Sequence, residues 1–516
     1  MTNADSLPAE TSRLRAFIPA LWFALISSIY FADIFLRASR KCFWADELFT
    51  VYLCRLPNFS SIWAAVTHGT DFNPPLFYLL TIGAQRLFGE GLIATRLPAI
   101  IGFWVFCVCL FVFVRRRAGA VAGAIAATFP FFTVAQYYAY EARPHGITLA
   151  WCGLALVCWQ RVEERRGTPL WAVGFGLSLI CALLTHVYAI YLIFPFGVVE
   201  LYNLWKSRRP NWHIVAAVIL SLALVVPIYL PLFRAYRSMI SKGVVLFAPQ
   251  DFLERFFLMV MGPELPVLLL AIAMFAAGWK RGSEKETGVV SIPRREVLLA
   301  VAFGFLPLVG IFGARITRGP FFNRYFLACI AGYAVLFAFA AFVRLPKSWA
   351  AGLAVFMSFL LLGDFGTAVF HWARHSDFTL VEPVSKFAFS PTAGNPMARK
   401  MTIASIKGDQ NILVLDQLDY IYLFRYAPPP AVSHLYYGAP TKDYFVASYE
   451  RLAKWAHLDV KTATFDNFFL NNKDFYVYGG SSSEPCGECI EVFLNAGYTL
   501  RSTRKDEDGL LYEYAR

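Results

Sequence analysis

The sequence predicts a polytopic α-helical membrane protein with a soluble α/β domain at its C-terminus. Of 516 residues, 58% are hydrophobic and only 16% are charged, whereas a soluble globular protein is about 25% charged. Apolar runs of about 20 residues, long enough to cross a bilayer, recur from residue 16 to about residue 370 and then stop. We therefore divide the chain into a transmembrane domain, 1–375, and a soluble domain, 376–516.

The apolar runs predict eleven transmembrane helices. Their ranges are 16–36, 94–114, 119–136, 146–160, 170–186, 188–205, 212–232, 262–279, 296–314, 325–343 and 349–370. The polar start of the chain runs into the first span with no small-residue cleavage site before Lys41. No cleavable signal peptide is therefore expected.

Charge orients these spans. Six short segments, alternating along the chain, hold 18 basic and 6 acidic residues, so their net charge of +12 equals that of the whole chain. By the positive-inside rule these segments are cytoplasmic, as is the N-terminus. The long loop 37–93 and, with an odd number of spans, the C-terminal domain then lie outside. Topology accounts for the basic pI of about 9.2, and no nucleic-acid partner is predicted.

The first outer loop is predicted to contain amphipathic helices that lie at the membrane surface and contact lipid. Helical apolar spacing covers Leu48–Leu56, Ser60–Val66 and Leu76–Phe88. Aromatic side chains of the kind found at membrane interfaces accompany them. These are Trp44, Trp63, Phe77 and Tyr78.

The C-terminal domain is predicted to alternate strands and helices. Strands are expected at 411–416 and 474–478, helices at 443–457 and 488–496, and a hairpin over 498–504 and 509–514. Gly497 is the expected residue that ends the last helix. No glycine-rich phosphate loop occurs in this part of the sequence, so no nucleotide is expected there.

Two cysteine pairs lie on the outer side. Cys42 and Cys54 share the first outer loop, and Cys486 and Cys489 form a Cys-Gly-Glu-Cys motif in the C-terminal domain. Two cysteines are too few for a closed zinc site. A local structural disulfide or a pair of free thiols is expected at Cys486 and Cys489.

Acidic residues cluster where a bilayer makes them costly, which by default indicates a functional site. Asp46 and Glu47 follow the first span, and Asp71 lies in the same loop. Glu141 and Arg143 lie in a very short outer connection, two residues apart, and so do not face each other on a helix. Helix capping by Asp46 or Asn73, before Pro74-Pro75, is the alternative for either residue alone, but it does not explain the cluster.

At these residues the sequence resembles the GT-C superfold of membrane glycosyltransferases. The resemblance lies in Trp-x-Asp-Glu at 44–47, Asp-x-Asn-Pro-Pro-Leu-x-Tyr at 71–78, Arg96-Leu97-Pro98, Gln136–Arg143, Thr185–Tyr188 and Asn323–Tyr325. The bacterial branch related to dolichyl-phosphate-mannose–protein mannosyltransferases and to the lipid A aminoarabinose transferase is most similar. One departure is His145, where that branch more often has tyrosine.

The resemblance implies transfer of a sugar from a polyprenyl-phosphate donor to a lipid, glycan or protein acceptor, outside the cytoplasm of a bacterial inner membrane. It implies that Asp46 is the base, supported by Glu47. Glu141 is then a further catalytic candidate, which would orient the acceptor. Arg143, Arg324 and His186 are candidates to bind the phosphate, and Asp71 and Asn73 to contact substrate. Asp71 and Glu141 also offer oxygen ligands to a divalent cation, although base-catalysed transfer requires no cofactor.

Structural roles are alternatives for two of these residues, and two other functions are alternatives for the protein. Arg324 is equally consistent with anchoring to lipid headgroups, and His186 with a hydrogen-bonded polar group at a helix end. Lys242, in the outer connection 233–261, is a weaker phosphate candidate. A transporter or flippase of polyprenyl-linked glycans is the alternative function, and an inactive scaffold is a third. Transporters place ionisable residues in mid-span, whereas these acids gather at span ends on one side.

Overall fold

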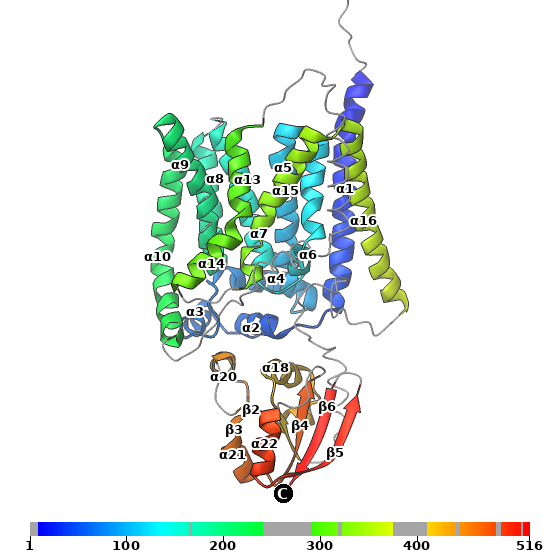
Figure 1. The fold of residues 1–516 in the computed structure, drawn as a ribbon, viewed down its shortest axis with the longest axis vertical. Coiled ribbons are helices and arrows are strands. Elements are labelled where there is room, and N and C mark those ends of the chain that lie inside the picture. The colour runs from blue at the N-terminus through cyan, green and yellow to red at the C-terminus, as the bar shows by residue number, and fades with distance from the viewer. Residues whose placement is uncertain are drawn as a thin grey trace, which may run out of the picture.

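The structure is a computed structural model of the whole chain. It describes residues 9–164, 168–240, 292–317, 322–374, 410–439, 444–480, 487–506 and 509–516. A bundle of long helices forms one part, and a domain built on a β-sheet lies beyond one end of that bundle (Figure 1). The predicted boundary between the domains, the predicted span 262–279 and Lys242 all fall outside the described residues.

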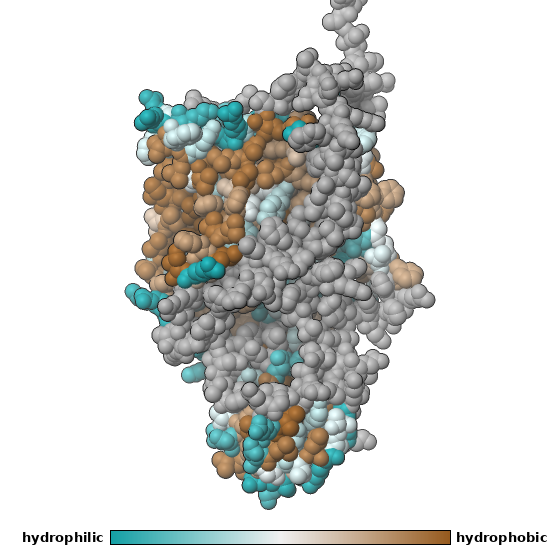
Figure 2. All heavy atoms as spheres, in the orientation of Figure 1, coloured by the Kyte–Doolittle hydropathy of each residue, from teal (hydrophilic) through white to brown (hydrophobic). Residues whose placement is uncertain are grey.

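The bundle consists of apolar helices. They are α1 (Ala9–Arg40), α5 (Leu92–Thr128), α7 (His145–Glu163), α8 (Thr168–Thr185), α9 (Ile193–Ser207), α10 (Trp212–Ile240), α13 (Arg294–Gly304), α14 (Leu306–Thr317), α15 (Cys329–Arg344) and α16 (Lys347–Arg374). Six helical stretches in the described part are long and apolar enough to span a membrane, or seven if the pair α13–α14, bent by 48°, is one span. Figure 2 shows the resulting hydrophobic band with hydrophilic residues at its upper rim. The protein is an integral membrane protein, while the predicted number of eleven spans stays a prediction.

Gly119 reverses the chain within α5. Its φ of +81° lies in the left-handed region, and the residues on either side are helical. A Cβ on Gly123 would lie only 2.9 Å from the carbonyl oxygen of Phe111, although 12 residues of straight helix span about 18 Å. The segment is therefore two antiparallel helices, as the separate predicted spans 94–114 and 119–136 require, with Arg115–Arg117 at the turn.

An ion-pair triad joins the outermost helices inside the membrane region. Nε of Arg37 on α1 donates to Asp33 at 2.8 Å, and another guanidinium nitrogen donates to Asp364 on α16 at 2.8 Å. Arg37 and Asp33 are buried, whereas the Asp364 side chain is 33% exposed. Buried charges of this kind require partners, so the triad ties α1 to α16.

A second charged network lies at the opposite, basic end of the bundle. Arg117 pairs with Glu164 at 3.1 Å and with Glu296 at 2.7 Å, and Arg116 also pairs with Glu164. Arg295 bonds Glu163 at 2.6 Å. These pairs join the turn of α5 to the ends of α7 and α13.

Three short helices build the loop 41–91, which was predicted to be the first outer loop. They are α2 (Ala45–Cys54), α3 (Phe59–Thr67) and α4 (Leu76–Phe88), which matches the three predicted amphipathic segments. They lie across the end of the bundle, between it and the C-terminal domain (Figure 1). Asn58 caps α3 by accepting from the Ser61 N–H at 2.9 Å.

The C-terminal domain contains a six-stranded sheet of order β3-β2-β1-β4-β6-β5. Its strands are β1 (Asn411–Val414), β2 (Leu435–Ala439), β3 (Thr462–Thr464), β4 (Asp474–Gly480), β5 (Thr499–Asp506) and β6 (Gly509–Ala515), and its helices are α18 (Gln417–Tyr426), α19 (Pro429–Val432), α20 (Tyr444–Ala456), α21 (Phe465–Asn471) and α22 (Gly487–Asn495). The first four strands are parallel, and β6 runs antiparallel to β4 and pairs with β5 as the predicted hairpin. Gly497 follows α22 with φ +88°, as expected of the residue that ends a helix. The predicted α/β class is confirmed.

Candidate active site

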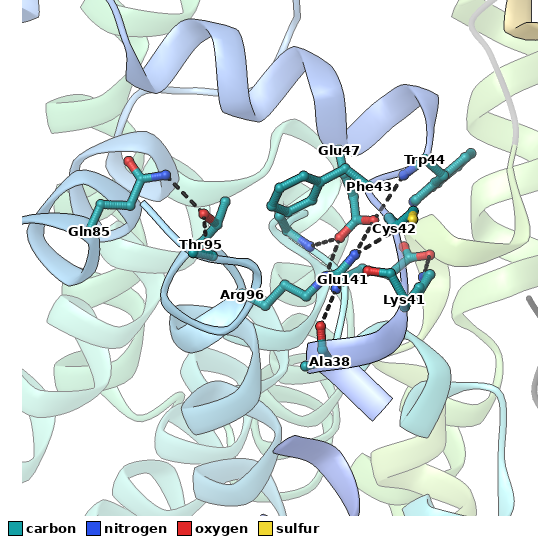
Figure 3. Close-up of polar contacts among 12 residues, drawn as sticks. Ala38, Lys41, Cys42, Phe43, Trp44, Glu47, Gln85, Thr95, Arg96 and Glu141 are labelled. Carbon is teal, nitrogen blue, oxygen red and sulfur yellow. Dashed lines mark hydrogen bonds and ion pairs between the residues drawn. The ribbon is translucent and has the colours of Figure 1, made fainter. Parts of the chain in front are cut away.

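Arg96 is the central hydrogen-bond donor next to the segment that contains Asp46 and Glu47. It is fully buried on α5, and its guanidinium bonds Glu47 at 2.7 and 2.8 Å. It also donates to the carbonyls of Ala38 and Lys41, each at 2.7 Å, and of Cys42 at 3.1 Å. Figure 3 shows Arg96 reaching between Ala38 and Glu47, under the connector that links α1 to α2.

Glu47 uses both carboxylate oxygens within the protein. Besides Arg96, it accepts from the N–H of Ala142 at 2.6 Å and of Trp44 at 3.2 Å. Burial alone would raise the pKa of Glu47, but Arg96 and Lys41 outweigh burial and hold that pKa below its usual range. Glu47 therefore stays ionised and fixes the start of α2 to the 140–144 connection.

Glu141 pairs with Lys41 at 3.0 Å, and both side chains are buried. The Lys41 ammonium also lies 4.1 Å from the centre of the Tyr137 ring. Burial raises the pKa of Glu141, and Lys41 only partly opposes this effect. The second carboxylate oxygen, Oε2, is buried and has no hydrogen-bond partner among the described residues. Glu141 and Arg143 thus bind different partners, as their spacing predicted.

Asp46 lies in the first turn of α2 and does not cap it, because the N-cap residue is Trp44. Its Oδ2 accepts from Arg324 at 2.9 Å, although 278 residues separate the two in the chain. The Arg324 guanidinium also lies 5.6 Å from the Trp44 ring centre. Within the part of the chain that the structure describes, Oδ1 of Asp46 accepts no hydrogen bond.

Asp71 pairs with Arg143 at 2.8 Å. The same carboxylate accepts from the Tyr78 hydroxyl at 2.8 Å and from the Asn73 side-chain amide at 2.9 Å. Despite burial, Arg143 holds the pKa of Asp71 below its usual range. Arg143 also donates to the main-chain carbonyl of Asp46 at 3.2 Å, which joins the two acidic segments.

A small cavity adjoins Arg324. His145 and His186 line it, with ring centres 5.2 Å apart, together with Tyr188 and Tyr325, whose rings stack at 4.2 Å. His186 caps the 3₁₀ turn η2 (Val187–Leu192) by accepting from the Tyr188 N–H. Burial lowers the pKa of His186 to about 3, so its imidazole is neutral at physiological pH.

The predicted site residues therefore converge at one end of the bundle. Asp46, Arg324, Asp71 and Arg143 form two linked ion pairs, and Glu47 and Glu141 lie in buried pairs behind them. Among the described residues, no group of three or more His, Cys, Asp or Glu could hold a metal ion. A role for Asp71 and Glu141 as metal ligands stays a prediction. Cys42 and Cys54 are free thiols.

Sequence analysis gave Arg96, Lys41 and Tyr78 no role in the site, although Arg96 and Tyr78 belong to the motifs of the resemblance and Tyr78 was expected at the membrane interface. Arg96 carried a signal, because an arginine beside an apolar run must find a partner. Lys41 and Tyr78 gave no such signal, since basic residues and tyrosines close to the membrane surface are typical of membrane interfaces.

Residues 72–230 match the model of the dolichyl-phosphate-mannose-protein mannosyltransferase family. The structure is similar to that of ArnT from Cupriavidus metallidurans in the apo state, with TM-score 0.57 and 14% identity, over 97% of this chain and 98% of that one. This protein has the fold of ArnT. A second ArnT structure, bound to undecaprenyl phosphate, matches with TM-score 0.52 and 16% identity over 96% of this chain and 97% of that one. No curated protein sequence matches the chain.

The two comparisons cover different parts of the chain. The ArnT likeness extends over the helical bundle and the C-terminal domain together, and at 14% identity it fixes the fold. The family match covers the part of the chain that contains Asn73, Glu141 and Arg143.

Proposed function

We propose that this protein transfers a sugar from a polyprenyl-phosphate donor to an acceptor on the extracytoplasmic side of the membrane, with Asp46 as the base. The observation that carries the proposal is the pairing of Asp46 with Arg324 at the wall of a cavity, beside the pair Asp71–Arg143. This arrangement sets a proton acceptor next to two guanidinium groups that bind anions.

The reaction needs both functions. The acceptor hydroxyl or amine loses a proton to Asp46 as its oxygen or nitrogen bonds the anomeric carbon of the sugar. The bond from that carbon to the phosphate oxygen breaks, and polyprenyl phosphate leaves with the electron pair. A phosphate monoester has a second pKa of about 6, so it departs as an anion and needs positive charge more than a proton.

Arg324 and Arg143 supply that charge. Guanidinium groups match phosphate oxygens in pairs, and preorganised donors stabilise a leaving anion without reorganising during the reaction. Nε of Arg143 is buried and has no partner among the described residues. It is therefore a donor that a phosphate would satisfy. The ArnT structure with undecaprenyl phosphate supports the choice of a polyprenyl phosphate carrier.

The remaining predicted residues act around this centre. Glu47, whose oxygens are occupied by Arg96, Ala142 and Trp44, holds Asp46 in place rather than reacting. Neutral His186 has its Nδ1 engaged by the Tyr188 N–H, which leaves the proton on Nε2 to donate into the cavity. Glu141, fully buried and paired with Lys41, lies behind this centre and does not line the cavity.

The test is transfer by purified protein in detergent, with a panel of short-chain polyprenyl-phosphate sugars and release of polyprenyl phosphate as the readout. Asp46→Asn removes the base but keeps the shape, and loss of a general base costs 10²–10⁴-fold in rate. The matched control is Asp466→Asn, because Asp466 is exposed on α21, in the C-terminal domain. Full activity of Asp46→Asn would show that another residue is the base. A transporter, by contrast, releases no polyprenyl phosphate in micelles, where no compartments exist.

A further inference from the structure

The C-terminal domain contacts the same loop that contains Asp46 and Asp71. A single hydrophobic cluster runs from α2, α3 and α4 into the C-terminal domain. The Tyr449 ring of α20 packs edge-on against Phe49 and Tyr52 of α2, at 6.0 and 6.5 Å between ring centres. In Figure 1, α18 and α20 are the elements of that domain nearest to α2 and α3.

Polar contacts also cross this interface, and one is made by Tyr426 at the end of α18. The Tyr426 hydroxyl accepts from the main-chain N–H of Phe43 at 2.9 Å and donates to the Phe43 carbonyl at 3.3 Å. One side chain thus binds both polar groups of one residue in the connector between α1 and α2.

The rest of that connector is held from within the transmembrane domain. Arg96 binds the carbonyls of Lys41 and Cys42, and Glu47 binds the N–H of Trp44. Buried main-chain groups need partners, and the main-chain groups of Phe43 find theirs in Tyr426 of the C-terminal domain. Asp46 lies three residues after Phe43, in the first turn of α2.

Another contact is made by Arg451 of α20 at the end of α3. This end is a Schellman motif, because Gly69, with φ +86°, donates to Val66 and Thr70 donates to Ala65. The carbonyls of His68 and Gly69 then point outward, and Arg451 donates to them at 3.4 and 3.3 Å. A cation at a helix C-terminus is also favoured by the helix dipole. Asp71 follows two residues after Gly69.

We propose that the C-terminal domain sets the position of both acidic segments of the active site, through Tyr426 for Asp46 and Arg451 for Asp71. Both are positioning residues, since neither contacts the cavity or the two ion pairs. The inference rests on the proposed function for its kinetic consequence, and it gives the C-terminal domain a part in the chemistry without assigning it a substrate.

The tests are Tyr426→Phe, which removes both hydrogen bonds to Phe43 and keeps the ring, and Arg451→Ala. Tyr436→Phe is the matched control for the first, because Tyr436 packs on the other face of the sheet, against Phe468. Lys454→Ala, exposed on the same helix, is the control for the second. Arg451→Lys keeps a cation at the end of α3 and should restore most of what Arg451→Ala loses.

Two readouts are needed. Hydrogen exchange in detergent should speed up about tenfold in the peptide 41–49 for Tyr426→Phe and in the peptide 66–73 for Arg451→Ala, because opening each segment loses hydrogen bonds. In the transfer assay, kcat should fall about tenfold for Tyr426→Phe and less for Arg451→Ala, with KM for the donor unchanged. A residue that only stabilised the fold would change neither the local exchange nor kcat of the folded fraction.

Unchanged exchange in both peptides, or kcat within twofold of wild type in both variants, overturns the inference. If Tyr426→Phe does not fold, Arg451→Ala decides by the same criteria. Failure of the proposed function is a separate result. If wild type releases no polyprenyl phosphate from any donor, the exchange measurement still decides whether the C-terminal domain holds the two segments.

Discussion

Removing Arg96 should be among the most damaging single substitutions in the transmembrane domain. Arg96→Gln leaves the fully buried Glu47 carboxylate without its cation, and it strips hydrogen bonds from the carbonyls of Ala38, Lys41 and Cys42. Breaking a buried pair by removing one partner costs about 3–5 kcal/mol. Gln cannot replace five donors, so the connector to α2 loses its support at the same time.

The matched control is the pair Arg55–Glu90, which joins α2 to the end of α4 at 3.3 Å. Its side chains are 41% and 63% exposed, and exposed pairs contribute about 0.2–1 kcal/mol. Arg55→Gln should therefore be close to neutral. A denaturant titration of both variants in the same detergent, followed by tryptophan fluorescence, compares the two losses directly.

A double substitution sharpens the result. Glu47→Gln removes the charge that Arg96→Gln leaves unpaired, so the double variant should be less destabilised than the sum of the single variants. Two results would contradict this reasoning. One is that Arg96→Gln lowers the free energy of unfolding no more than Arg55→Gln does. The other is that the losses from Arg96→Gln and Glu47→Gln simply add in the double variant, which would show that Arg96 and Glu47 are not energetically coupled.

Two more predictions concern pH and backbone conformation. The pKa of His186 is about 3 in the folded protein and about 6.5 in the unfolded chain, so the unfolded state binds the proton more tightly. The stability that the neutral imidazole contributes is therefore complete above pH 6.5 and falls as the pH drops towards 3. At pH 4 the loss is about 3 kcal/mol. Thermal melts at pH 7 and pH 4 should therefore show a smaller loss for His186→Gln than for wild type, and equal losses would contradict burial of a neutral imidazole. Gly69→Ala should cost about 1 kcal/mol or more, since φ is +86° there, whereas Gly83→Ala in α4, with nothing within 4 Å of a new Cβ, should be neutral or stabilising; the reverse order in melting temperature would rule out the Schellman turn.

The sequence was sufficient for features that depend on local patterns. Hydropathy predicted the helices of the bundle, including the separate spans on either side of Gly119, because the length needed to cross a bilayer is a local property. Apolar spacing likewise placed the helices of the first outer loop. The short strands β2 and β3 were not predicted, since five and three residues are too few to show the alternation of apolar and polar residues that marks a strand.

The sequence could predict which residues lie near one another in the candidate site but not how they pair. Carboxylates near a bilayer are costly, so Asp46, Asp71 and Glu141 could be selected from their positions alone. Their partners could not be selected, because Arg324 reaches Asp46 across 278 residues and Lys41 reaches Glu141 across 100. Such pairs exist only once the helices pack.

The triad of Arg37, Asp33 and Asp364 has a consequence for how the chain assembles. The two members on α1 are made first and already neutralise each other as an i, i+4 pair. Asp364 follows 327 residues later, on α16, and is a single charge in an apolar helix until it meets Arg37. Since α16 is the last described helix of the bundle, its docking against α1 closes the bundle. A charge in an apolar helix is costly without a partner, so the pairing of Asp364 with Arg37 favours packing of α16 against α1.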